Sequence, residues 1–278
     1  MSIQRRLNFI RGYLSPSRDF PIGIKELCAG LLCSTCQQLA RPKIEFLREE
    51  GDFLVLKTFQ LPKVLYLPKT MPLYNLSMVI VENLYADDWH YYEVPETRVM
   101  PDDIVLDCGA AEGLFSLQAM ERARQIIAFE PLPLWVACLN RTFAGTRNVR
   151  IVPKALGSNE KTGFLQQGVL NSSVGRNSTG IPVDIVSVDH WFSTAGLERI
   201  DYIKGDIEGF ELEVLKGAKQ IIRLYKPRIA LTTYHDGNNW REILDFCRSL
   251  VPTYAWRVKG IRYSDCKARP IMIHLWPV

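Results

Sequence analysis

The sequence predicts an α/β fold, in which an N-terminal helical and hairpin appendage precedes a doubly wound, mostly parallel seven-stranded sheet with helices on both faces. Three observations predict this class. Apolar strand-like runs alternate with amphipathic helical patterns from about residue 100 onward, at the spacing of βαβ units. A glycine-rich turn at 107–113 lies between the first such strand and its helix. Hydrophobic residues make up 47% and charged residues 23% of the 278 residues, as in ordinary globular proteins.

The appendage is expected to span residues 1–95. Its first 50 residues have the pattern of two polar-to-amphipathic helices, broken near Pro16 and Pro21 and ending before Pro42. Two β-rich runs within 52–68 then predict a hairpin.

Helix signals over 72–93 are mixed with an aromatic cluster, which consists of Tyr85, Trp89, His90, Tyr91 and Tyr92. Two alternatives fit this cluster. It is a lid that stacks on a ring of the ligand, or an apolar seam that docks the N-terminal part onto the sheet.

The larger domain is expected to span residues 96–278. Its parallel strands are predicted at 104–107, 126–130, 149–152, 200–204 and 229–233. Its helices are predicted at 114–120, 134–143, 212–218 and 240–247. Two closing antiparallel strands are predicted at 254–258 and 271–275. An insertion rich in Gly, Ser and Asn is expected over 157–190, with a strand near 183–188.

The charge distribution argues against a nucleic-acid partner. The 34 basic and 30 acidic residues give a formal charge of +4, and the first 18 residues hold Arg5, Arg6, Arg11 and Arg18 with no acid. Residues 19–278 therefore sum to zero. A protein that binds nucleic acid spreads its positive charge over one face of the fold.

The cysteines and the apolar runs indicate a reducing compartment. Seven scattered cysteines do not form a disulfide framework, and no apolar run is long enough for a secretory signal or a membrane span, so we expect a cytoplasmic protein. Cys28, Cys33 and Cys36 have the spacing of plant-type ferredoxins. Their flanks look helical, so we interpret them as small apolar residues on a helix.

The first motif with chemical meaning is the turn from Asp107 to Gly113. Such a strand–turn–helix unit lets a nucleotide-like ligand approach the backbone closely. A dinucleotide fingerprint would need glycine at 107, 109 and 112, whereas this chain has Asp107 and Glu112. These acids favour a cationic ligand such as S-adenosylmethionine (SAM), which carries a sulfonium, an ammonium and no phosphate. The alternative is a tight turn without a ligand.

An acid also ends the second strand. Glu130 lies 17 positions after Gly113, where a carboxylate can accept both hydroxyls of a ribose.

Acidic residues and a histidine follow strands four and five. Asp206, Glu208 and Glu211 come after strand four, either as helix-capping groups with Asp206 as N-cap or as groups for chemistry. His235 follows strand five, beside the expected place of Asp206, and can take a proton at neutral pH. We expect the other three histidines to be structural. They are His90, His190 and His274.

Together these motifs resemble the FkbM-type family of SAM-dependent methyltransferases, within the class I (Rossmann-like) methyltransferases. The resemblance covers about residues 90–235 and is most specific in the block 204–218. It implies a Rossmann-like fold and methyl transfer from SAM to hydroxyl groups of sugars, glycans or secondary metabolites. The family usually has Asn at the position of Ala111 and a non-glycine residue at Gly205.

The resemblance also implies roles for residues. Cofactor-binding residues would be Asp107, Gly109, Ala110, Gly113, Glu130, Pro131, Ala155 and Leu156. Catalytic residues would be Asp206 and His235, as candidates for the base, with Glu208 in support. We expect no metal, although a divalent ion on these three catalytic side chains is an alternative.

Other functions remain open at this point. One alternative is a methyltransferase that acts on a protein or RNA, and another is a non-catalytic SAM-binding module. The catalytic set above favours an enzyme. The sequence carries no signal for the individual acceptor or for the oligomeric state.

Overall fold

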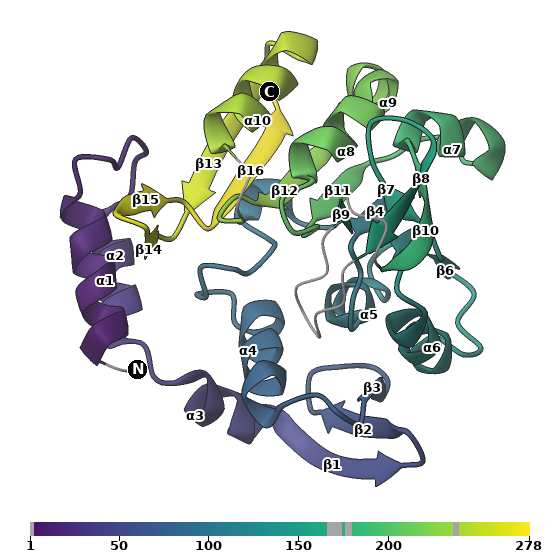
Figure 1. The fold of residues 1–278 in the computed structure, drawn as a ribbon, viewed down its shortest axis with the longest axis horizontal. Coiled ribbons are helices and arrows are strands. Elements are labelled where there is room, and N and C mark those ends of the chain that lie inside the picture. The colour runs from purple at the N-terminus through teal and green to yellow at the C-terminus, as the bar shows by residue number, and fades with distance from the viewer. Residues whose placement is uncertain (1–2, 166–173, 176–179, 236–238) are drawn as a thin grey trace.

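The computed structural model describes residues 3–165, 174–175, 180–235 and 239–278. Its centre is a seven-stranded sheet in the order β13-β16-β12-β11-β4-β5-β6 (Figure 1). The strands are β4 (Ile104–Cys108), β5 (Gln125–Phe129), β6 (Val149–Val152), β11 (Tyr202–Gly205), β12 (Arg228–Thr232), β13 (Tyr254–Lys259) and β16 (Met272–Pro277). The five strands from β12 to β6 run parallel, and β16 and β13 close the sheet in antiparallel pairs. The predicted fold class is confirmed.

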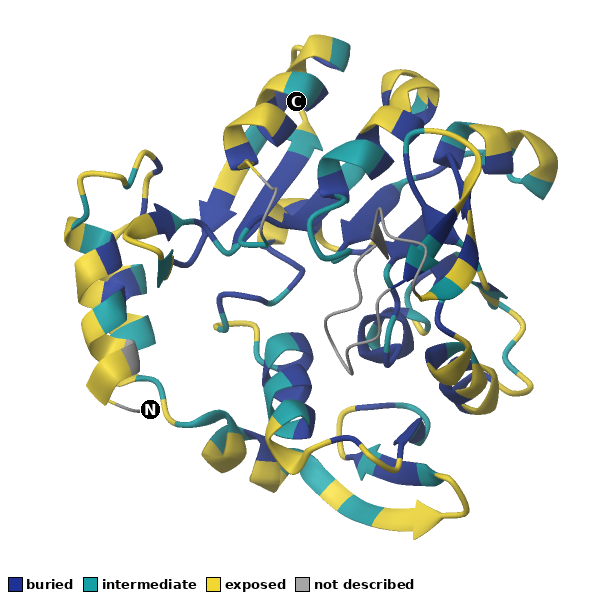
Figure 2. Cartoon of the chain, viewed as in Figure 1, coloured by how far each residue is buried: buried dark blue, intermediate teal, exposed yellow. Residues whose placement is uncertain are grey.

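Helices cover both faces of this sheet. One face packs on α7 (Val188–Ala195), α8 (Glu211–Gly217), α9 (Lys219–Tyr225) and α10 (Trp240–Leu250). The other packs on α5 (Leu114–Ala119) and α6 (Pro133–Thr142). Every residue of β4 is buried, which explains why its sequence is a continuous apolar run, and Figure 2 shows most of the central sheet in dark blue.

A smaller four-stranded sheet follows β6. Its order is β7-β10-β8-β9, with β7 (Ala155–Leu156), β8 (Lys161–Leu165), β9 (Val174–Gly175) and β10 (Ile181–Val186). The strand predicted near 183–188 therefore ends at Val186, and His190 lies in α7 rather than in an insertion. The reason is local: the Ser187 side chain accepts a hydrogen bond from the His190 N–H and caps the new helix. The remainder of the predicted insertion, 166–173 and 176–179, lies outside the described residues.

The appendage differs from its prediction in two elements. It contains α1 (Ile3–Leu14), α2 (Ile24–Leu32), α3 (Cys36–Ala40), η1 (Arg41–Lys43), β1 (Ile44–Glu50), β2 (Phe53–Thr58), β3 (Leu65–Pro68), α4 (Leu73–Leu84) and η2 (Pro95–Thr97). The hairpin β2–β3 is confirmed, whereas α3 and β1 were not predicted. A capping box between Thr35 and Gln38 starts α3, and β1 pairs with β2 to make a three-stranded sheet.

The cysteine interpretation needs a correction for the same reason. Cys28 lies in α2 and Cys36 begins α3, but Cys33 is the extended residue that ends α2. The three thiols therefore do not share one helix.

Trp89 forms an apolar seam between the appendage and the sheet. Its ring lies 4.5 Å from that of Phe9 in α1. A methyl group added at Gly30 in α2, or at Gly260 after β13, would overlap the same indole. These two glycines let α2 and the end of β13 approach Trp89, and the seam alternative is confirmed for this residue.

The division into units at residues 95 and 96 stays a prediction. No helix among the described residues is long and apolar enough to cross a membrane.

A final pair of short strands, β14 (Arg262–Ser264) and β15 (Lys267–Arg269), forms a hairpin beside α1 (Figure 1).

Candidate active site

Two turns meet at the carboxyl edge of the sheet, one after β4 and one after β11. Gly109 has a φ of +77°, and a Cβ at this position would overlap the backbone oxygen of Asp206. The N–H groups of Gly109 and Ala110 donate to the carbonyl oxygen of Phe129, at 3.0 and 2.9 Å. Only glycine allows the first turn to lie this close to the second.

A buried lysine joins the same two turns. Lys204 Nζ lies 2.9 Å from Asp107 Oδ1 and donates to the carbonyl oxygen of Gly109 at 2.6 Å. Ser116 donates to the other carboxylate oxygen of Asp107 at 2.7 Å. Burial opposes the charge of Lys204, but Asp107 and Asp206 outweigh it and raise its pKa. Asp107 is thus fully buried and held by both Lys204 and Ser116.

A cavity of about 170 Å³ opens above these turns. Six of the predicted cofactor-binding residues line it: Gly109, Ala110, Glu130, Pro131, Ala155 and Leu156. Asp107 and Gly113 do not. Gly113 instead starts α5 with a φ of +81°, and a Cβ there would meet Leu139 of α6 at 2.5 Å.

Glu130 closes one side of the cavity. Its carboxylate accepts hydrogen bonds from the N–H groups of Ala111 at 2.9 Å and Leu132 at 2.8 Å. Burial raises the pKa of Glu130 to about 7, although these two donors and Lys204 oppose the shift. Burial also raises the pKa of Glu112 to about 7.

Ala111 has a φ of +43°, a left-handed conformation that asparagine adopts more readily than alanine. This preference gives a backbone reason for the asparagine usual at this position in the family that the sequence resembles.

Asp206 lies where the cavity meets the end of β11. Its Oδ2 accepts a hydrogen bond of 2.6 Å from the hydroxyl of Tyr92, and His90 Nε2 lies 3.7 Å from the same oxygen. Burial alone would raise the pKa of Asp206, but His90, His235 and Lys204 lower it to about 2. The capping alternative is wrong for Asp206, because α8 begins at Glu211 with Phe210 as N-cap.

Glu211 stabilises the turn after β11 through its buried carboxylate. Its carboxylate accepts hydrogen bonds from the N–H groups of Ile207 at 3.2 Å and Gly209 at 3.0 Å, and from the Thr232 hydroxyl at 2.8 Å. The side chain is fully buried. Glu211 therefore fixes the backbone that presents Asp206 and Glu208.

His235 lies between Glu208 and Glu211 and carries a positive charge. Its Nδ1 lies 3.3 Å from Glu211 Oε1, and its Nε2 lies 3.3 Å from Glu208 Oε2. Burial disfavours the charged ring, but the neighbouring carboxylates raise the pKa of His235 to about 9. Burial raises the pKa of Glu208 to about 7, with His235 opposing and Asp206 and Glu211 adding to the shift. At neutral pH His235 is an imidazolium that donates a hydrogen bond to Glu211 and forms an ion pair with Glu208.

One group of side chains among the described residues has the geometry of a metal site. The ligand atoms of Asp206, Glu211 and His235 lie within 4.8 Å of one another. This set differs from the predicted alternative by having Glu211 in place of Glu208. Glu211 already accepts three hydrogen bonds, and a protonated His235 supplies the positive charge that these carboxylates need.

Two site residues, His90 and Tyr92, were missed by the sequence analysis. His90 was expected to be structural, yet its Nε2 lies 3.1 Å from the Tyr234 hydroxyl, and Tyr92 bonds to Asp206. Their signal was the aromatic cluster just before β4, of which Tyr92 and His90 reach the site while Trp89 forms the seam. His274 is buried as expected, and burial holds its pKa well below its usual range.

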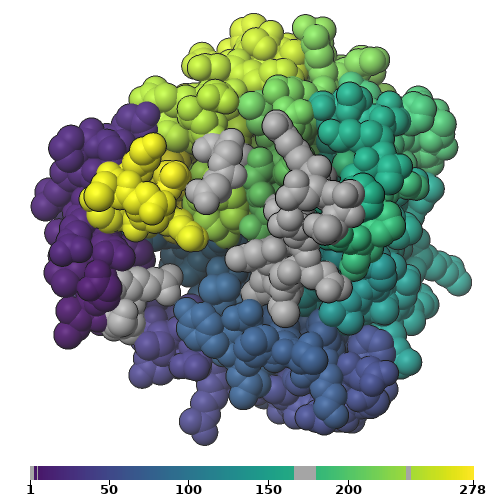
Figure 3. All heavy atoms as spheres, in the orientation of Figure 1, coloured from purple at the N-terminus to yellow at the C-terminus, as the bar shows by residue number. Residues whose placement is uncertain are grey.

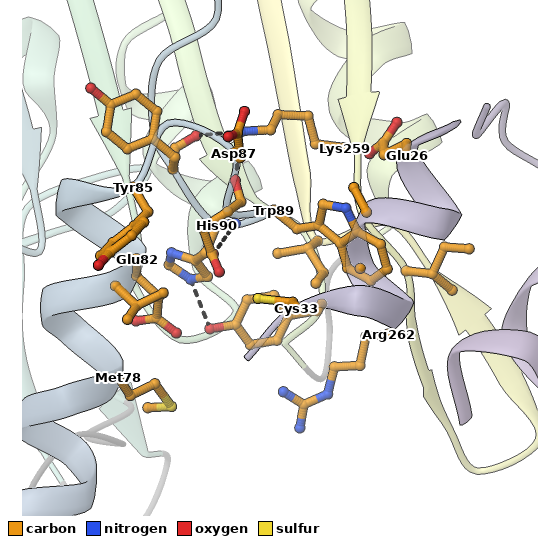
Figure 4. A pocket seen from close by; sticks show the side chains of 18 of the residues that line it. Glu26, Cys33, Met78, Glu82, Tyr85, Asp87, Trp89, His90, Lys259 and Arg262 are labelled. Atoms are coloured by element: carbon orange, nitrogen blue, oxygen red, sulfur yellow. Dashed lines mark hydrogen bonds between the residues drawn. The ribbon is translucent and has the colours of Figure 1, made fainter. Parts of the chain in front are cut away.

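A much larger cleft of about 2150 Å³ adjoins the cavity. The cleft and the cavity share six of their lining residues, which are Met78, Glu82, His90, Glu208, Phe210 and Tyr234. Figure 4 shows Met78 and Glu82 of α4 on one side of this cleft, with Glu26 of α2 and Cys33, the residue after α2, on the other. In Figure 3 the surface is hollowed between the N-terminal helices, α4 and the C-terminal hairpin.

Comparison with known proteins identifies the family. The sequence profile described as the methyltransferase FkbM domain matches residues 107–251, just over half of the chain. The chain belongs to the FkbM methyltransferase family. Membership makes it a methyltransferase of a SAM-dependent, Rossmann-like family, and the predicted family is confirmed.

Relatives of this FkbM methyltransferase are distant. Methyltransferase sdnD of Sordaria araneosa is 28% identical over 189 residues, which cover 53% of this chain and 72% of that protein. The 2-O-methyltransferase NoeI of Sinorhizobium fredii (strain NBRC 101917 / NGR234) is 28% identical over 192 residues, which cover 58% and 78%. The crystal structure of methyltransferase FkbM from Methylobacillus flagellatus KT is similar with a TM-score of 0.49 and 21% identity. That match covers 76% of this chain and 56% of the other, so this chain spans little more than half of that protein.

The Lys204–Asp107 pair gives the first prediction. Lys204→Met leaves a buried carboxylate without its cation, which we expect to lower the free energy of unfolding by about 3–5 kcal/mol. Asp107→Asn in the same chain removes that charge, so the double variant loses less than the sum of the single variants. Urea unfolding followed by circular dichroism measures all three.

The matched control is Lys216→Met, which breaks the half-exposed pair with Glu213 and changes stability by at most about 1 kcal/mol. A Lys204→Met variant no less stable than this control contradicts the structural role of the pair.

Proposed function

We propose that this protein is a SAM-dependent O-methyltransferase that methylates a hydroxyl group of a sugar, glycan or secondary metabolite. The observation that carries the proposal is the shared wall between the cavity and the large cleft. Glu208, a carboxylate with a pKa near 7, lies in this wall, where a cofactor in the cavity meets an acceptor in the cleft. The printed activity of the relative NoeI, a 2-O-methyltransferase, supports an oxygen acceptor.

The chemistry of the cavity fits SAM. Five carboxyl groups line it, those of Glu82, Glu112, Glu130, Asp206 and Glu208. Its two lysines are each paired with an acid, Lys204 with Asp107 and Lys154 with Asp184 at 3.0 Å. A cationic ligand suits this surplus of acids better than a pyrophosphate does. Apolar groups of Leu156 and Leu165, which also line the cavity, offer a surface for an adenine ring.

Glu208 is the best base in the cluster. SAM, when bound, supplies a methyl group on a positively charged sulfur, which an aligned oxygen can accept in an in-line displacement. The acceptor hydroxyl must lose its proton as this happens. A base works best when its pKa lies near the working pH, so Glu208, at about 7, is better matched than Asp206, at about 2. His235 already carries its proton at neutral pH.

The other two predicted catalytic residues then position the base. His235 donates a hydrogen bond to Glu211 and forms an ion pair with Glu208, which orients the side chain of Glu208. Asp206 is held by Tyr92 and supplies a permanent negative charge at the cavity wall. This charge stabilises a neighbouring cation and the imidazolium of His235.

The large cleft has the chemistry of a polar, ring-shaped acceptor. Its lining includes aromatic side chains, among them Tyr85 and Tyr234, and carboxylates such as Glu82 and Asp87. Aromatic faces stack on sugar rings and carboxylates accept hydrogen bonds from hydroxyl groups.

The carboxyls at the cavity predict that SAM binding depends on pH. Below about pH 7 Glu112 and Glu130 take up protons and lose their attraction for a cation, so affinity for SAM falls from pH 8 to pH 6. The loss is up to about tenfold for each carboxyl that must be ionised. Glu130→Gln removes part of this dependence, and calorimetric titration at pH 6, 7 and 8 measures it. An unchanged pH dependence in Glu130→Gln, or binding of NAD in place of SAM, contradicts the assignment.

Replacing the base tests the reaction itself. We expect Glu208→Gln to lower kcat by about 10²–10⁴-fold, because the acceptor proton has no base, with a smaller loss of affinity for SAM because one negative charge near the sulfonium is removed. Methyl transfer from labelled SAM to a panel of sugar and phenolic acceptors measures the rate.

The matched control is Glu213→Gln in α8. Glu213 lines neither the cavity nor the cleft and pairs with Lys216, so this variant keeps the wild-type rate. If Glu208→Gln turns over as fast as Glu213→Gln, Glu208 is not the base.

A further inference from the structure

Helix α1 packs on the protein through one face. Phe9 contacts Trp89, with ring centroids 4.5 Å apart. Gly12 lies against β14 and the residue before it, since a Cβ at this position would come within 2.6 Å of Ile261 and 3.2 Å of Tyr263. Phe9 and Gly12 are both buried, so this is the inner face of α1.

The opposite face of α1 carries aliphatic side chains that are exposed to solvent. Ile3 is 78% exposed, Leu7 40%, Ile10 39% and Leu14 72%. Spacings of four, three and four residues place them on one narrow stripe along the helix. Single exposed apolar residues are common on proteins, but a continuous stripe marks an interaction surface. Figure 2 shows α1 at the edge of the molecule, largely in the colour of exposed residues.

Arginines border this stripe. At about 100° per residue, Arg6 and Arg11 fall on its two sides, and both side chains are exposed. Within the part of the chain that the structure describes, neither has an ion-pair partner. Residues 3–14 contain no acid, and Asp19, the first acid in the chain, pairs with Arg241. The outer face of α1 is therefore an apolar stripe between two free cations.

We propose that α1 docks the protein on a lipid bilayer that contains anionic lipids. Aliphatic side chains on one face of a helix insert at the boundary of head groups and acyl chains, and arginines beside them attract lipid phosphates. A second copy of the chain fits this face less well, because a symmetric pairing brings the same arginines together without an acid between them.

The docked helix leaves the active site open. Asn8 and Phe9, on the inner side of α1, line the large cleft, whereas the stripe faces away from it. Docking thus neither uses nor blocks the groups of the proposed reaction.

Co-sedimentation of the full chain with vesicles tests this docking. The vesicles are phosphatidylcholine alone or phosphatidylcholine mixed with phosphatidylglycerol. We expect binding to the anionic vesicles, and a loss of at least about tenfold in the double variant Leu7→Ser/Ile10→Ser, which removes buried apolar area. Arg6→Gln/Arg11→Gln also weakens binding, and the difference from wild type shrinks as salt is raised.

Helix α9 supplies matched controls, because Leu224 is 69% exposed and Arg223 is exposed too. Leu224→Ser and Arg223→Gln should bind as the wild type does, and all variants should melt at the wild-type temperature. Equal binding to both vesicle types, no binding at all, or an equal loss in the α9 variants overturns the proposal. So does a dimer in sedimentation velocity that Leu7→Ser/Ile10→Ser converts to monomer, since the stripe is then an interface between copies.

Discussion

The ammonium group of Lys204 holds together the three segments from which the site is built. It pairs with Asp107 and bonds to Gly109 in the turn after β4, and it projects from β11, the strand that ends at the turn of Asp206. It also lies 5.0 Å from the centre of the Tyr92 ring, which comes from the appendage side and bonds to Asp206. A cation this deeply buried is stable only while its partners remain in place. The turn after β4, the turn that carries Asp206 and the segment that carries Tyr92 therefore have one common arrangement.

The structure contains two kinds of buried carboxylate that a sequence motif does not distinguish. Asp107 and Glu211 are fully buried and engaged by cations or backbone donors, and they shape the turns. Glu130 and Glu208 lie at the cavity wall with pKa values near 7, within range of a ligand. Burial without a full set of partners is what gives them that value, and a pKa near neutrality suits both a cation site and a base.

The inner strands of the central sheet were predictable because they are buried on both faces, as β4 is at every residue, and therefore form continuous apolar runs. Strand β1 was not, because its outer residues, which end in Arg48, Glu49 and Glu50, are exposed and polar. The site residues that follow strands were predictable from the rule that parallel strands end at one edge. His90 and Tyr92 were not, because they precede β4 and reach Asp206 through the tertiary fold. The charge of His235 could not be predicted from the sequence either, because it depends on Glu208 and Glu211 being brought to either side of the ring.

A crystal structure of the protein with S-adenosylhomocysteine, the demethylated product, tests the central claim most directly. The account predicts the ribose hydroxyls on Glu130, the adenine beside Ala155 and Leu156, and the sulfur facing the wall formed by Glu208 and Asp206. A ligand bound elsewhere, or one whose sulfur faces away from this wall with its ribose far from Glu130, would contradict it.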